Sequence, residues 1–154
     1  MLWLFVLNLG IAFGAGLYES RVVVPQWLAG APESGYRWDA EAVRQAATGV
    51  RFWVYVTTVP LTLLTLANLV AARRARGPLR GWWLGAVGAA VLDRLFTFAY
   101  FIPTMVRLMR EEALPQPEAV ATALQWVNLN HLRHAFVLAA WLAALKALSL
   151  LPAR

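Results

Sequence analysis

Residues 126–134 read WVNLNHLRH and run directly into AFVLAAWLAALKALSLL at residues 135–151. The second part carries a single charge, at Lys146, and approaches the roughly 20 apolar residues that cross a bilayer. The first part is polar, and histidine and arginine side chains are costly in or near hydrocarbon. The stretch therefore predicts a membrane-spanning helix whose first turns carry a functional site.

The rest of the chain has the same apolar character. Hydrophobic residues make up 60% of its 154 residues and charged residues 14%, against about 25% charged in an ordinary soluble domain. Residues 2–18, 52–72 and 81–106 are long apolar segments, the last interrupted only by Asp93 and Arg94. We expect one all-α domain, residues 1–154, that forms an antiparallel, integral membrane four-helix bundle in the lipid bilayer, with helices at about 2–24, 40–72, 81–109 and 118–150.

The distribution of charge predicts how this bundle is oriented. The short loop between the second and third helices carries four arginines, which is typical of a cytoplasmic loop: Arg73, Arg74, Arg76 and Arg80. With four spans, both termini are then cytoplasmic, and we expect the chain in the cytoplasmic (inner) membrane. The net charge of +6 thus reflects topology rather than nucleic-acid binding. Residues 1–18 lack a charged N-terminal region, so we expect a retained helix and no cleaved signal peptide.

Single residues predict local features of the helices. Gly10 and Gly14 form a Gly-x-x-x-Gly pair that favours close packing of a neighbouring helix. We expect Pro25 to end the first helix, Asp39 to cap the second and Pro60 to kink it.

Polar residues recur on each helix at the spacing of one face, and such faces avoid lipid. We therefore expect them to meet inside the outer half of the bundle, with Asp93 as the floor. Adjacent residues point about 100° apart on a helix, so the buried charges Asp93 and Arg94 are expected to have separate partners, Asp93 facing Arg51 or Arg133. The predicted faces are Asn8, Ala12, Ala15 and Glu19; Arg51, Tyr55, Thr58, Thr62 and Thr65; Asp93, Thr97, Tyr100, Thr104 and Arg107; and Trp126, Asn130 and Arg133, with His134 beside them.

A positive pocket with histidine and tyrosine suits an anionic or phenolic ligand, because arginine binds planar carboxylates and phenolates and histidine exchanges protons near neutral pH. A metal is an alternative, since His131 and His134 are three residues apart and Glu19 could be a third ligand. The neighbouring arginines disfavour a metal ion, and no second helix offers a histidine to a haem. We predict that neither a metal nor another cofactor is bound, and the sequence leaves a bound metal and a bound haem as open alternatives. The chain has no cysteine, which excludes disulfides and thiolate chemistry.

Short motifs resemble a known family over nearly the whole layout of the chain. They are the Gly-rich first helix followed by Tyr18-Glu19-Ser20 and Val24-Pro25, the run Tyr100-Phe101-Ile102-Pro103-Thr104 followed by Leu108, and the spacing of Trp126, Asn130 and Arg133 as W-x-x-x-N-x-x-R. The chain resembles the small four-helix integral membrane proteins of the anthrone-oxygenase-like family, formerly a domain of unknown function. Some members resemble enzymes that oxidise anthrones to anthraquinones with dioxygen and no obvious redox cofactor.

The resemblance implies a membrane oxidoreductase that acts on a phenolic, polycyclic or quinone-like small molecule. It would be an oxygenase that works without a cofactor. It supports Glu19, Pro103, Thr104, Trp126, Asn130 and Arg133 as motif positions. Roles follow from chemistry. The catalytic candidates are His134 or His131 as the base and Arg133 as the anion-holding group. The substrate-binding candidates are Glu19, Arg51, Trp53, Tyr100, Thr104, Trp126 and Asn130, with Trp53 and Trp126 forming the slot for the rings.

Two other functions are consistent with the sequence. One is a non-catalytic accessory subunit, in which the Gly10 and Gly14 face packs against a larger membrane complex or a second copy of the chain. The other is a small-ligand carrier or sensor, which binds a lipid-soluble anion without turnover.

Overall fold

The structure is a computed structural model that describes residues 1–30, 35–110 and 114–151. Within these ranges the chain is almost entirely helical. Four helices are long and apolar enough to cross a membrane, judged by length and composition: Leu2–Trp27, Gly49–Arg74, Gly77–Leu108 and Gln116–Ser149. The prediction of an all-helical chain with four helices long and apolar enough to span a membrane is confirmed.

Three of these spans change helix type along their length. The first joins α1 (Leu2–Tyr18), η1 (Glu19–Val23) and α2 (Val24–Trp27), and the second joins η2 (Gly49–Thr58) and α4 (Val59–Arg74). The third joins α5 (Gly77–Phe96), η3 (Thr97–Phe101) and α6 (Ile102–Leu108), whereas the fourth is the single helix α7 (Gln116–Ser149). The η segments are π-helical, with the wider i→i+5 turn.

Each π-helical segment lies just before a proline in the first turn of the next α-helix: Pro25, Pro60 and Pro103. Proline has no N–H, and its ring clashes with the carbonyl four residues earlier, which a wider turn relieves. The carbonyl four residues before Pro60 is that of Val56, and it accepts a hydrogen bond from Asn8 Nδ2 at 2.8 Å. The expectation that Pro25 ends the first helix is wrong, because the π-helical turn lets the helix pass through it.

The segment between the first two spans is more broken than the sequence suggested. β1 (Leu28–Ala29) and β2 (Arg37–Trp38) pair antiparallel, and α3 (Ala40–Ala46) follows. Asp39 caps α3 as predicted, since its carboxylate accepts the Ala42 N–H at 2.8 Å. The predicted continuous helix over residues 40–72 is wrong, because Ala47 adopts a left-handed conformation (φ 46°) that ends α3.

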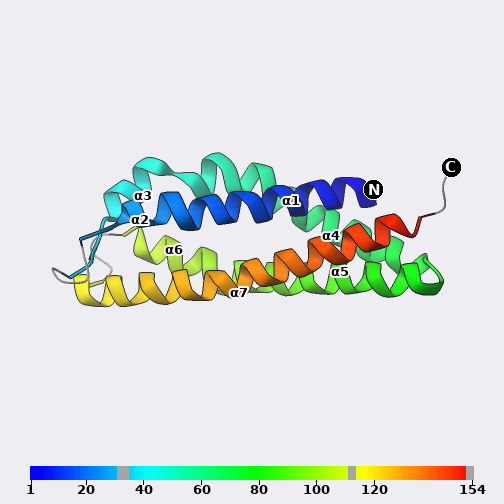
Figure 1. Ribbon diagram of the computed structural model, residues 1–154. Coiled ribbons are helices and arrows are strands. Elements are labelled where there is room, and N and C mark those ends of the chain that lie inside the picture. The colour runs from blue at the N-terminus through cyan, green and yellow to red at the C-terminus, as the bar shows by residue number, and fades with distance from the viewer. Residues whose placement is uncertain (31–34, 111–113, 152–154) are drawn as a thin grey trace.

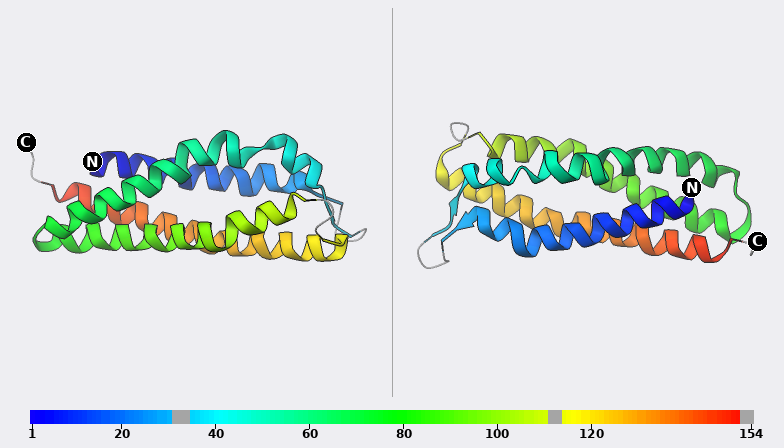
Figure 2. Two further views of the ribbon diagram at one scale, coloured as in Figure 1. Left: turned by 180° about the vertical axis from the view of Figure 1, so that it is seen from behind. Right: turned by 90° about the horizontal axis from the view of Figure 1, so that it is seen from above.

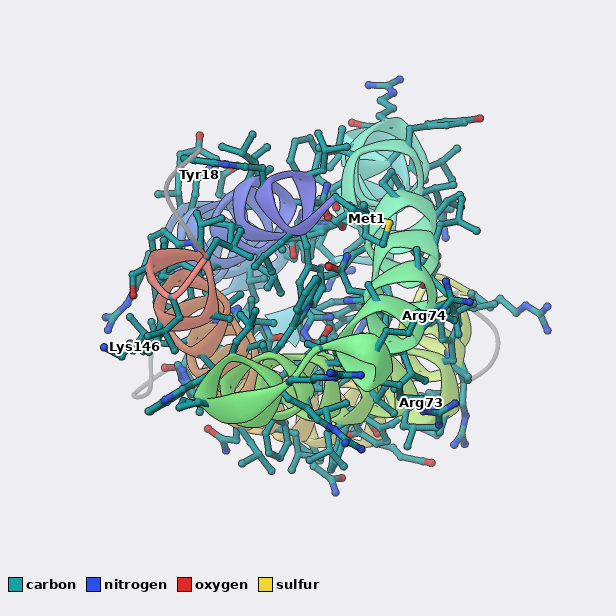
Figure 3. The ribbon with its side chains drawn as sticks, turned by 90° about the vertical axis from the view of Figure 1, so that its right-hand side faces the viewer. Met1, Tyr18, Arg73, Arg74 and Lys146 are labelled. Atoms are coloured by element: carbon teal, nitrogen blue, oxygen red, sulfur yellow. The ribbon has the colours of Figure 1, made fainter. Side chains whose placement is uncertain are left out.

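The four long helices contact one another in a closed order. α7 packs against α1 and α5, and α4 packs against the same two helices. The start of α1 and the end of α7 lie at the end of the molecule where α4 turns into α5 (Figures 1 and 2). Figure 3 views this end and labels Met1, Arg73, Arg74 and Lys146. An apolar core fills this half, built around Phe5, Leu9, Leu61, Val87 and Ala140.

The β1–β2 hairpin closes the opposite end of the molecule. It is hydrogen-bonded to the third and fourth spans. Trp38 is 4% exposed, and its indole Nε1 donates to the carbonyl of Leu108 at 2.8 Å. The side-chain amide of Gln116 accepts from the Trp38 N–H and donates to the Trp38 carbonyl, both at 3.1 Å. Trp38 therefore fastens the first loop to the end of α6 and the start of α7.

We predict that Trp38→Phe lowers the free energy of unfolding by about 1–3 kcal/mol, because it leaves the buried Leu108 carbonyl without a donor. Trp82→Phe is the matched control, since Trp82 is 48% exposed. Unfolding curves in mixed detergent micelles measure both changes. Equal losses for the two variants would show that the clamp contributes nothing.

Candidate functional site

A cavity of about 290 Å³ lies in the half of the molecule that contains the π-helical segments. Residues from all four candidate spans line it, together with α3. Its walls include aromatic rings and apolar side chains, and its polar lining carries both carboxylates and guanidinium groups. The lining includes Glu19, Thr48, Trp53, Asp93, Arg94, Phe101, Trp126, Arg133 and His134.

Arg133 is the central charged side chain of this cavity. Its guanidinium carbon lies 4.8 Å from the ring centre of Phe101 and 5.8 Å from that of Trp53, within cation–π range. The side chain is only 13% exposed, and Nε lies 4.0 Å from Asp93 Oδ1, too far for a hydrogen bond. Among the described residues, none accepts a hydrogen bond from this guanidinium. Its donors are therefore available to a ligand in the cavity.

Glu19 fixes one aromatic wall. It is 6% exposed, and its Oε1 accepts hydrogen bonds from Trp53 Nε1 at 2.7 Å and from Thr48 Oγ1 at 2.9 Å. The Trp53 ring thus lies between a buried carboxylate at its N–H and the Arg133 guanidinium at its face. The opposite wall is held similarly, because Trp126 Nε1 donates to the Phe101 carbonyl at 3.2 Å.

His134 lines the cavity beside Arg133, whereas His131 is exposed and does not. His134 is 6% exposed, and its Nε2 is buried without a hydrogen-bond partner. The ring lies against Gly16 so closely that a Cβ there would sit 2.6 Å from Nε2. Of the two histidines predicted as candidate bases, the geometry therefore brings only His134 to the site.

The two buried charges of the third span are not separated as expected. Arg94 donates to Asp93 Oδ2 through Nε at 2.9 Å and through Nη2 at 2.5 Å, because its long side chain folds back along the helix. Asp93 Oδ1 has no hydrogen-bond partner and faces Arg133. Of the two partners expected for Asp93, Arg51 and Arg133, the structure thus brings Arg133 close. Asp93 therefore lies between two guanidinium groups at the floor of the cavity.

The expected convergence of Arg51, Tyr100, Thr104 and Asn130 on the cavity is wrong. Arg51 is exposed, as is Tyr55 one turn later. Tyr100, Thr104 and Asn130 are at least partly buried outside the lining, and Asn130 Nδ2 donates to Ser20 Oγ at 3.1 Å.

The physical reason is the π-helical turn, which changes which residues share a face. The predicted faces assumed 3.6 residues per turn, but a π-helix has more residues per turn. As a result η2 presents Trp53 and Thr57 to the cavity, together with Thr48 at its N-terminal end. On the third span η3 brings Phe101 inward instead of Tyr100. Sequence reasoning missed Thr48, Thr57 and Phe101. The available signal was the proline that follows each of these segments.

No group of three or more histidine, aspartate or glutamate side chains in the described ranges could hold a metal ion. The alternative of His131, His134 and Glu19 as a metal triad is not assembled, because His131 lies on the exposed side of α7.

We predict that Gly16→Ala displaces His134, because the added methyl group would overlap Nε2. Gly14→Ala is the matched control on the same helix, since no atom lies within 4 Å of a Cβ there, and replacing glycine by alanine in a helix adds about 1 kcal/mol of stability. The chemical shifts of ¹⁵N-labelled histidine report the environment of the ring. The same His134 spectrum in both variants would show that Gly16 does not set the position of the imidazole.

Of the predicted Gly10 and Gly14 pair, only Gly10 packs closely against another helix among the described residues. A Cβ on Gly10 would lie 3.2 Å from the ring of Trp141, whereas Gly14 has no close neighbour.

Compared with known proteins, the chain matches no protein-family model, no curated protein and no solved structure.

Proposed function

We propose that this chain is an antiparallel four-helix bundle of the cytoplasmic membrane, with both termini and the α4–α5 turn in the cytoplasm. Its cavity then lies in the outer half of the bilayer. The arginines at the α4–α5 turn support this orientation, because cytoplasmic loops are enriched in lysine and arginine.

We predict that a cysteine at Arg76 is labelled by a membrane-impermeant maleimide only after the membrane is broken, whereas a cysteine at Tyr36 is labelled in intact cells. Both side chains are exposed, and the chain has no cysteine of its own, so the background is clean. Labelling at residue 76 in intact cells would reverse the orientation.

We further propose that the cavity binds a planar phenolic or quinone-like molecule and that the protein is a cofactor-independent oxygenase for it. The observation that carries this proposal is the Arg133 guanidinium, which is largely buried, stacked on aromatic rings and without an acceptor among the described residues. Arginine binds planar oxyanions through several parallel donors, and aromatic walls favour flat rings. A volume of about 290 Å³ is near the lower end of ligand pockets, which favours a molecule of a few fused rings.

His134 supplies the acid–base step in this proposal. The imidazole of His134, which lines the cavity, accepts a proton from the acidic methylene carbon of an anthrone, while Arg133 holds the enolate oxygen. The anion gives one electron to dioxygen, and the two radicals join in a C–O bond to form a peroxide anion. This anion takes back the proton from His134, and the resulting hydroperoxide loses water to give the ketone. Anthrone and O₂ thus become anthraquinone and H₂O, and no electrons are needed from a cofactor. The resemblance to the anthrone-oxygenase-like family points to the same substrate class.

A carrier or sensor is the second candidate, because the same cavity would bind the ligand without His134. The two are separated by whether binding of an anthrone is followed by consumption of dioxygen.

We predict that His134→Ala lowers the turnover number for 1,8-dihydroxyanthrone by roughly 10²-fold or more, the usual contribution of a general base. Arg133→Ala should mainly raise KM, and Arg133→Lys should recover part of the loss, since lysine keeps the charge but not the planar fork. His131→Ala is the control and should be unaffected, because His131 is exposed.

Dioxygen uptake by the protein in lipid nanodiscs is the measurement, corrected for the spontaneous oxidation of the anthrone. Equal activity in all four variants would remove Arg133 and His134 from the mechanism. Saturable binding without uptake would favour the carrier.

A further inference from the structure

The cavity reaches the outer surface of the helices on one side. Val50 of η2 and Ile102 of α6 both line it, yet they are 64% and 41% exposed. Both belong to candidate membrane spans. Apolar side chains that line a cavity and are also exposed on a membrane span border an opening towards lipid.

This opening lies between the second and third spans. η2 packs against α1 and α4, whereas α6 packs against α7 and η3. In Figure 1 and in the left view of Figure 2, η2, between α3 and α4 along the chain, lies apart from α6, whereas the right view of Figure 2 shows both along the same side of the molecule. The cavity extends between these two segments. Trp53 and Thr57 line it on the side of the second span, and Phe101 and Met105 line it on the side of the third span.

The end of this opening next to the hairpin is bridged. Arg44 of α3 donates through Nη1 to the carbonyl of Met109, the residue after α6, at 2.6 Å, and both residues line the cavity. Glu41 holds the same guanidinium at 2.6 Å, and its hydrogen bonds with Arg44 and Gln45 keep the pKa of the Glu41 carboxyl below its ordinary value. The buried Trp27 and Val43 line the cavity behind this bridge.

We propose that the ligand enters sideways from the lipid, between η2 and α6, past Val50 and Ile102. This inference rests on the proposed ligand-binding function and narrows its substrate class. The ligand is an amphiphile whose fused rings dissolve in the bilayer and whose acidic oxygen edge moves inward to Arg133. A water-soluble anion of the same size would instead have to pass the Arg44–Met109 bridge on the side that faces the hairpin.

The test follows the entry of 1,8-dihydroxyanthraquinone, a stable probe that quenches tryptophan fluorescence, from donor vesicles into proteoliposomes. Val50→Phe and Ile102→Phe, combined, narrow the opening. Leu63→Phe and Leu95→Phe, combined, are the matched control, because these residues lie on the same two spans, are 62% and 59% exposed, and do not line the cavity. None of these changes alters a tryptophan, and each keeps a lipid-exposed position apolar.

The expected result is that the narrowed variant shows association and dissociation rates about tenfold lower than wild type, with an equilibrium affinity that changes little, since entry and exit share one route. The control variant should keep both wild-type rates. Unchanged rates in the narrowed variant, with saturable quenching intact, would overturn the lateral route and leave the proposed function standing. Absence of saturable quenching in the wild type would overturn the proposed function itself and this inference with it.

Discussion

In a membrane, every backbone carbonyl that a proline leaves without its usual donor must be satisfied inside the protein. Three prolines impose this constraint on three of the four spans, each in the half of the molecule that contains the cavity. The wide turns before them enlarge the helices locally, and Asn8 supplies a donor for one of the affected carbonyls. The cavity, its aromatic walls and the position of Arg133 all depend on these turns, since the same residues in regular α-helices would present other side chains.

The apolar segments of the sequence were enough to predict four spans, because hydropathy and length alone decide whether a helix can cross a bilayer. The polar faces of these spans also placed Glu19, Arg133 and His134 in one region, and all three line the cavity. The phase of the second and third spans could not be obtained this way, since one π-helical turn rotates every residue beyond it, as Arg51 and Tyr100 show. The Asp93–Arg94 pair was missed for a different reason, because backbone direction does not limit the reach of a flexible arginine side chain.

Charge balance at the site complements the apolar route to it. Glu19 and Asp93 offset Arg94 and Arg133, so this buried set carries no net formal charge, as the cost of burying ions requires. Adding a preformed anion would unbalance it. A neutral phenol or anthrone crosses lipid readily and becomes an anion only on transfer of its proton. A proton acceptor within the cavity, the part proposed for His134, therefore suits a ligand that arrives uncharged.

The Trp38 clamp has a mechanical consequence. It joins the hairpin, α6 and α7 into one unit, whereas η2 is held by other contacts. The Glu19 carboxylate accepts from Thr48 and Trp53, Asn8 donates to the Val56 carbonyl, and the Arg133 guanidinium of α7 lies over the Trp53 ring. The Trp38 clamp and the Glu19 hydrogen bonds thus hold different walls of the cavity. Loss of the Glu19 carboxylate would therefore release the Thr48 and Trp53 side chains while the hairpin stays fastened to α6 and α7.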